Sequence, residues 1–136
     1  MGEWIWNLFV SERAAPDHPV VKAFAANDWG LWGRLMLVAI AVLIAPITEE
    51  LYFRGLLLGG LLQLTKLPWL SIALSAIAFG LAHANQPQVV APIVTLGLIL
   101  GYVRVHLNSI QLCIVIHALF NGRTMALILL DPTQLR

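Results

Sequence analysis

Residues 30–64 read GLWGRLMLVAIAVLIAPITEELYFRGLLLGGLLQL, and this stretch decides the fold. It is apolar over most of its length, as in a helix that spans a membrane, yet Glu49, Glu50 and Arg54 lie within it. An ionised side chain at the centre of a bilayer costs about 2.5–3.5 kcal/mol on insertion scales. Charged groups at such a depth usually pair with one another or mark a functional site. The stretch therefore predicts a membrane-spanning helix that carries a polar site.

The composition of the whole chain supports a membrane protein surrounded by lipid. Of the 136 residues, 60% are hydrophobic and only 11% are charged, whereas soluble domains average about 25% charged residues. The formal net charge of +1 is too small to indicate binding to nucleic acid. The single cysteine, Cys113, excludes a disulfide framework within the chain and lies in an apolar run, where we expect it to pack.

Apolar runs predict an all-α, multi-spanning transmembrane bundle of four or five helices. One helix over residues 31–64 would be about 50 Å long, more than a bilayer needs, so we expect a break at Pro46. Glu49 and Glu50 would then lie in the first turn of the second helix, where the helix dipole favours carboxylates. The predicted helices cover residues 30–45, 47–64, 69–84, 89–103 and 109–130.

The chain divides into an N-terminal segment and one transmembrane domain. Residues 1–29 combine helically spaced aromatic and aliphatic residues with a proline-containing stretch, which predicts an interfacial helix and a linker. Residues 30–136 contain no soluble linker that would separate two cores. Glycines at small-xxx-small spacing, Gly55/Gly59 and Gly97/Gly101, predict close helix packing, either within the chain or with partner helices in a homo-oligomer.

Helical spacing assigns different partners to the two glutamates. Glu50 and Arg54 are four residues apart, so they lie on one helix face and can form an ion pair. Glu49 points about 100° away from Glu50 on the same helix. We therefore expect Arg54 to hold Glu50 ionised and Glu49 to be the carboxylate that is available as a general base.

Three further polar residues lie on other predicted helices. His117 and Asn121 are four residues apart and share one helix face, and His83 stands at the end of its helix, four residues after Phe79. If successive helices alternate in direction, His83 and Glu49 lie toward the same side of the membrane. We expect these groups, from three helices, to line one cavity.

Known motifs of several intramembrane proteases are missing from the sequence. It has no HExxH zinc motif, no Gly-x-Ser-Gly nucleophile and no pair of membrane aspartates. Two interpretations of the remaining residues stay open. Glu49 and His83 can deprotonate a water while His117 and Asn121 stabilise an oxyanion. In the alternative, Glu49, His83 and His117 are zinc ligands with a water in the fourth position.

Three motifs, Glu49-Glu50-x-x-x-Arg54, Phe79-x-x-x-His83 and His117-x-x-x-Asn121, occur in this order over residues 45–121. They resemble the motifs of the CAAX-processing and bacteriocin-processing (CPBP, or Abi) intramembrane proteases, a family that includes the type II CAAX prenyl endopeptidases. Members usually have further transmembrane helices before the first motif, whereas here one predicted helix precedes it. The family has been described both as zinc metalloproteases and as glutamate-dependent proteases, so zinc and no metal both remain open.

The resemblance implies an endopeptidase that acts on a peptide or membrane-protein substrate, with residues in defined roles. We expect it to be an integral protein of the bacterial inner (plasma) membrane. Two other classes stay open: a non-catalytic immunity or scaffold protein, and a proton-coupled transport subunit in which the buried charges relay protons. The implied roles are principal base for Glu49, support for Glu50, structural support for Arg54 and Phe79, water activation for His83, and the oxyanion hole for His117 and Asn121, with metal binding as the alternative for His117.

Overall fold

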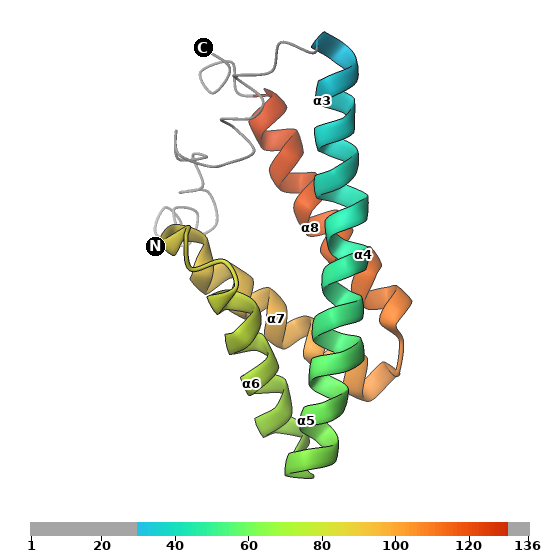
Figure 1. Ribbon diagram of the computed structural model, residues 1–136, viewed down its shortest axis with the longest axis vertical. Coiled ribbons are helices and arrows are strands. Elements are labelled where there is room, and N and C mark those ends of the chain that lie inside the picture. The colour runs from blue at the N-terminus through green and yellow to red at the C-terminus, as the bar shows by residue number, and fades with distance from the viewer. Residues whose placement is uncertain (1–29, 131–136) are drawn as a thin grey trace, which may run out of the picture.

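The charged segment lies inside one continuous helix. The computed structural model describes residues 30–130, and the helix runs from Gly30 to Thr65 over 36 residues. It is the long vertical helix in Figure 1. The predicted interfacial helix and linker of residues 1–29 lie outside the described residues. Along the long helix the successive elements are α3 (Gly30–Ala39), the π-helical turn η1 (Ile40–Ile44), α4 (Ala45–Glu50), the π-helical turn η2 (Leu51–Leu57) and α5 (Leu58–Thr65).

The predicted break at Pro46 is wrong, and hydrogen bonding explains why the helix continues. In η1 the Ala45 N–H bonds the carbonyl oxygen of Ile40, five residues back. In the same pattern the Ala41 carbonyl would accept a hydrogen bond from the main-chain nitrogen of Pro46, but proline has no N–H to donate. Asn121 Nδ2 donates to that carbonyl instead, at 2.9 Å. A wider π turn and a side chain from a distant helix thus accommodate the proline.

This continuity changes the setting of the two glutamates. Glu49 and Glu50 lie in the middle of a helix about 54 Å long, and not in a first turn. The residue before α4, Ile44, has helical dihedral angles and makes no side-chain capping bond. The expected stabilisation by a helix N-terminus is therefore wrong, and the carboxylates must be stabilised by side chains.

The other three helices follow the predicted apolar runs. They are α6 (Pro68–Leu81), α7 (Pro87–Leu107) and α8 (Ile110–Leu130). Prolines occupy the first turn of α6 and α7, where their missing N–H is not needed. Lys66 and Asn108 adopt left-handed dihedral angles that end α5 and α7. The end of α6 at Leu81 falls before the predicted residue 84, so His83 lies in the turn that follows the helix.

The described residues form helices and no strand, which confirms the all-α transmembrane bundle. Three helices are long and apolar enough to cross a membrane: Gly30–Thr65, Pro87–Leu107 and Ile110–Leu127. Large apolar side chains cover their outer surface, for example Leu56 and Leu64, which are 72% and 81% exposed. Such surfaces belong in lipid. The chain is therefore an integral membrane protein.

Close packing of α6 against α7 holds the lower part of the bundle together (Figure 1). A Cβ atom added at Gly97 would lie 3.0 Å from Cα of Ala76, and one at Gly101 would lie 2.9 Å from Cγ2 of Ile72. These two glycines therefore form a packing face within the chain, as the small-xxx-small spacing predicts. Within the chain the prediction is wrong for Gly55 and Gly59, since a Cβ atom at Gly59 would meet no atom within 4 Å and one at Gly55 would make only ordinary contacts. α8 packs against η1 and α4 of the long helix, and this contact brings the polar residues of distant segments together.

Candidate active site

A buried ion pair stands at the centre of the site. Arg54 Nη1 donates to Glu50 Oε1 at 3.0 Å, and both side chains are buried. Arg54 Nη2 also donates to the Gly97 carbonyl of α7 at 3.4 Å, and its guanidinium carbon lies 4.4 Å from the centre of the Phe79 ring. The pair expected from the i,i+4 spacing is thus present. It is held from three sides, as a charge removed from water requires.

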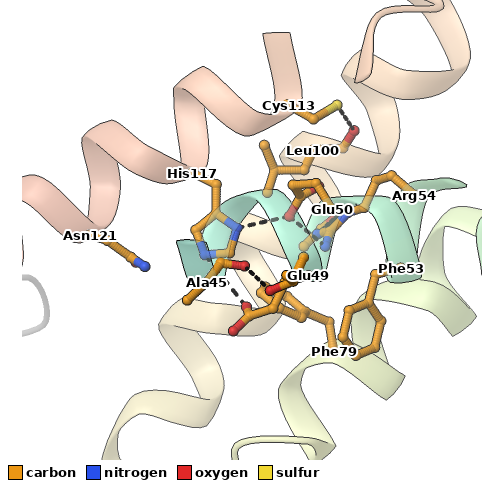
Figure 2. Close-up of polar contacts among 12 residues, drawn as sticks. Ala45, Glu49, Glu50, Phe53, Arg54, Phe79, Leu100, Cys113, His117 and Asn121 are labelled. Atoms are coloured by element: carbon orange, nitrogen blue, oxygen red, sulfur yellow. Dashed lines mark hydrogen bonds and ion pairs between the residues drawn. The ribbon is translucent and has the colours of Figure 1, made fainter. Parts of the chain in front are cut away.

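His117 connects this ion pair to the second glutamate. Its Nδ1 lies 2.8 Å from Glu50 Oε1, and its Nε2 lies 3.7 Å from Glu49 Oε2 (Figure 2). A carboxylate paired with Arg54 only accepts hydrogen bonds, so Nδ1 carries the hydrogen of the shorter contact. This contact fixes the imidazole ring and turns Nε2 toward Glu49. Arg54, Glu50, His117 and Glu49 therefore form one continuous polar chain.

The two glutamates have different environments, as helix geometry predicts. Glu50 is completely buried between Arg54 and His117. The side chain of Glu49 is 28% exposed. Its carboxylate faces Nε2 of His117, the ring nitrogen that does not contact Glu50. Glu49 is thus the carboxylate that remains accessible to another molecule.

Asn121 lies one turn after His117 on α8 and also faces the long helix (Figure 2). It is partly buried, and its Nδ2 donates to the carbonyl oxygen of Ala41 at 2.9 Å. An amide nitrogen carries two hydrogens, so this contact leaves a second donor. The structure therefore brings Asn121 to the same helix contact as Glu49, Glu50 and His117.

His83 reaches this group only through Phe79. The buried Phe79 ring makes an edge-to-face contact with the His117 ring at 5.5 Å between centroids, and another with the His83 ring at 5.2 Å. His83 Nδ1 lies 3.0 Å from the Phe79 carbonyl oxygen. Within residues 30–130 the His83 ring makes no hydrogen bond to Glu49 or His117. The structure thus places His83 beside the polar chain and not within it.

The arrangement does not fit the zinc site that the sequence left open. Among the residues that the structure describes, no group of three or more His, Cys, Asp and Glu side chains is placed to hold a metal ion. A histidine that binds zinc through Nε2 commonly donates its Nδ1 hydrogen to a carboxylate, so the bond from His117 to Glu50 does not itself oppose zinc. The residue that does not fit is His83, whose ring contacts the Phe79 ring and whose Nδ1 lies at the Phe79 carbonyl. Glu49 and His117 alone face each other, so the three ligands that the sequence offered are not brought together.

Two main-chain contacts of the site have no direct signal in the residue pattern. The Gly97 carbonyl accepts from Arg54, and the Ala41 carbonyl accepts from Asn121. The nearest sequence signal for the second contact is Pro46, since its missing N–H leaves a helical carbonyl without a donor. Cys113 is fully buried, and its thiol contacts the Leu100 carbonyl at 3.4 Å, in agreement with its predicted packing role.

Comparison with known proteins identifies the family. Neither the curated proteins nor the solved structures contain a match to this chain. A family model described as type II CAAX prenyl endopeptidase Rce1-like matches residues 31–123, which include every residue of the site. This match confirms the resemblance seen in the three motifs. The chain therefore belongs to the Rce1-like family of type II CAAX prenyl endopeptidases.

Proposed function

We propose that the protein is an intramembrane endopeptidase that hydrolyses a peptide bond with a water held between Glu49 and His117. One observation carries the proposal: Glu49 Oε2 and His117 Nε2 face each other at 3.7 Å. This separation exceeds a direct hydrogen bond, and a water placed beside the two atoms can bond to both. Membership of a family of endopeptidases supports the same conclusion.

Glu49 acts as the general base in this mechanism. It takes a proton from the water as the water oxygen bonds to the carbonyl carbon of the substrate. It then returns the proton to the amide nitrogen, the C–N bond breaks, and an amine and a carboxylic acid leave. The exposure of Glu49 suits this role, since the base must reach both the water and the leaving nitrogen.

Glu50 and Arg54 are positioning residues for His117. Glu50 bonds Nδ1 and so directs Nε2 toward the water, while Arg54 holds Glu50 in place. A catalytic imidazole oriented by a buried carboxylate is a recurring arrangement in hydrolases. The polar chain thus gives both glutamates a function in one reaction.

Asn121 and His117 are assigned to the oxyanion that forms during attack. Asn121 uses the Nδ2 hydrogen that Ala41 does not occupy, and the His117 ring, which Glu50 holds in place at Nδ1, is the second group assigned to it. His83 has a supporting role: its Nδ1 is fixed at the Phe79 carbonyl, and its ring packs against the same Phe79 ring that contacts His117. Donors that are already in place before the reaction lower the barrier most.

The substrate class follows from the site and from the family. The described helices include three that are long and apolar enough to span a bilayer, and the matching family is described as type II CAAX prenyl endopeptidase Rce1-like. We propose a lipid-associated peptide as the substrate and the bacterial inner membrane as the location. An immunity protein or a proton-coupled transport subunit would require no peptide hydrolysis, so the test below distinguishes these classes.

The test is peptide cleavage by the purified chain in lipid vesicles, with lipidated and unlipidated fluorogenic peptides as substrates. Glu49→Gln should lower kcat by about 100-fold or more, which is the usual contribution of a general base. The control is Thr48→Val at the neighbouring position, where the hydroxyl bonds only carbonyls of its own helix; this variant should retain its activity. Cleavage that survives Glu49→Gln would exclude Glu49 as the base, and no cleavage by the unaltered chain would favour a non-catalytic protein.

A further inference from the structure

A cavity next to Arg54 lies outside the group formed by Glu49, His117 and Asn121. Its volume is about 190 Å³, and it lies between the long helix and the end of α7. This volume admits several water-sized groups. The lining residues are Arg54, Gly59, Leu62, Arg104, Val105 and Asn108. Neither Glu49 nor Glu50 is among them, so the charged groups that line the cavity are both cations.

Both arginines have an unused hydrogen-bond donor. The Nε atoms of Arg54 and Arg104 are buried and have no hydrogen-bond partner within the described part of the chain. Arg54 as a whole is only 1% exposed. A buried donor without an acceptor is unfavourable. An anion in the cavity would accept from both guanidinium groups, and guanidinium groups suit phosphate oxygens particularly well.

The charge of Arg104 is also not balanced by an ion pair. Arg104 Nη1 donates to the side-chain oxygen of its neighbour Asn108, which is a neutral group. Among residues 30–130, the ion pairs to carboxylates involve Arg54 and His117, and none involves Arg104. Arg54 is neutralised by Glu50, so the positive charge of Arg104 remains for a ligand in the cavity.

The position of the cavity indicates where such an anion comes from. α7 has 21 residues, enough to cross the bilayer, and Arg104 and Asn108 lie at its C-terminal end. At this end Trp69 stacks near Tyr102, with 5.9 Å between ring centroids, and Tyr102 stacks near His106 at 4.3 Å. Trp69 and Tyr102 are 66% and 46% exposed. Exposed Trp and Tyr side chains mark the level of the lipid headgroups, which places the cavity at the depth of the phosphate groups.

We propose that this cavity binds the phosphate of an anionic phospholipid headgroup, through Arg104 and the Nε of Arg54. The proposal does not depend on the peptidase activity. It predicts that the protein retains phosphatidylglycerol in preference to phosphatidylcholine, because the unbalanced charge of Arg104 disfavours the positive choline group.

Two glycines provide a matched pair of variants. A Cβ atom at Gly59 or at Gly60 would meet no atom within 4 Å, so both positions accept a larger residue without a backbone clash. Gly59 lines the cavity and Gly60 does not. Gly59→Leu therefore fills the cavity, while Gly60→Leu makes the same chemical change on the outer face. Arg104→Gln removes the charge and is the third variant.

The experiment measures retention of short-chain phosphatidylglycerol and phosphatidylcholine by the purified full chain, with native mass spectrometry and with the shift in Tm. The unaltered chain and Gly60→Leu should prefer phosphatidylglycerol by about tenfold, and Arg104→Gln and Gly59→Leu should lose this preference, as expected for loss of a charge-assisted hydrogen bond. Equal retention of both lipids by the unaltered chain would overturn the proposal, and so would equal losses in Gly59→Leu and Gly60→Leu.

Inorganic phosphate at matched concentration distinguishes the two sources of the anion. If the lipid is the ligand, phosphate alone leaves Tm unchanged. If phosphate alone raises Tm as much as phosphatidylglycerol does, the cavity binds a soluble anion and the lipid assignment is wrong. Should Arg104→Gln fail to fold, the two glycine variants still decide the outcome.

Discussion

Glu50 Oε1 accepts hydrogen bonds from both Arg54 and His117, at 3.0 Å and 2.8 Å. This buried oxygen thus links Glu50 and Arg54 of the long helix to His117, which lies 67 positions after Glu50 in the chain. Because the same atom neutralises a cation and orients an imidazole, the stability of the bundle and the geometry of the site depend on a single carboxylate.

The first prediction concerns this shared carboxylate. Glu50→Gln leaves Arg54 as a buried charge without its partner, which should destabilise the fold by about 3–5 kcal/mol. Arg54→Gln should also destabilise it. The double variant should lose clearly less stability than the sum of the two, because it removes both charges together. Unfolding in a denaturant series measures all three variants, and additive losses would contradict the pairing.

The second prediction concerns the imidazole between the two glutamates. His117→Gln removes the ring nitrogen that faces Glu49, so peptide cleavage should fall by about 100-fold or more. His106→Gln is the control, since His106 is exposed and its ring stacks near the rings of Trp69 and Tyr102. Cleavage assays on both variants measure the difference, and equal activities would exclude His117 from the reaction.

The third prediction separates the two roles of Asn121. Asn121→Ala removes the donor to the Ala41 carbonyl and should cost about 1 kcal/mol of stability. Pro46→Ala supplies a main-chain N–H close to that carbonyl, so Asn121→Ala should cost less stability in a Pro46→Ala background. If Asn121 also binds the oxyanion, peptide cleavage stays low in the double variant although stability recovers. Recovery of both quantities would show that Asn121 acts only on the helix.

Residue spacing along one helix predicts those contacts of the site that are made within that helix. The Glu50–Arg54 pair and the split between the glutamates depend on the helical repeat alone, and the apolar runs indicate the helices themselves. The continuous path through Pro46 could not be predicted, because the donor to the Ala41 carbonyl is Asn121, 80 residues from Ala41. The contact of His117 with both glutamates depends likewise on how α8 crosses the long helix, and no residue pattern encodes that crossing.

The same limit applies to the position of His83. Its motif spacing places it correctly near Phe79, but α6 ends at Leu81, two residues before His83, and the histidine therefore lies in a turn. The Phe79 ring lies between the His83 ring and the His117 ring, and this packing of side chains from different helices has no signal in the residue spacing.

The fourth prediction concerns the packing face that holds α7 against α6. Gly97→Ala places a methyl group 3.0 Å from Cα of Ala76, against backbone that cannot move alone. We expect a loss of about 1–3 kcal/mol, as for other overpacked positions, together with lower activity, because the Gly97 carbonyl accepts from Arg54. Gly60→Ala is the control, since its added methyl group meets open space and should raise helix stability slightly. Thermal unfolding in detergent compares the two, and an equal or smaller loss at Gly97 than at Gly60 would refute the close approach of α6 and α7.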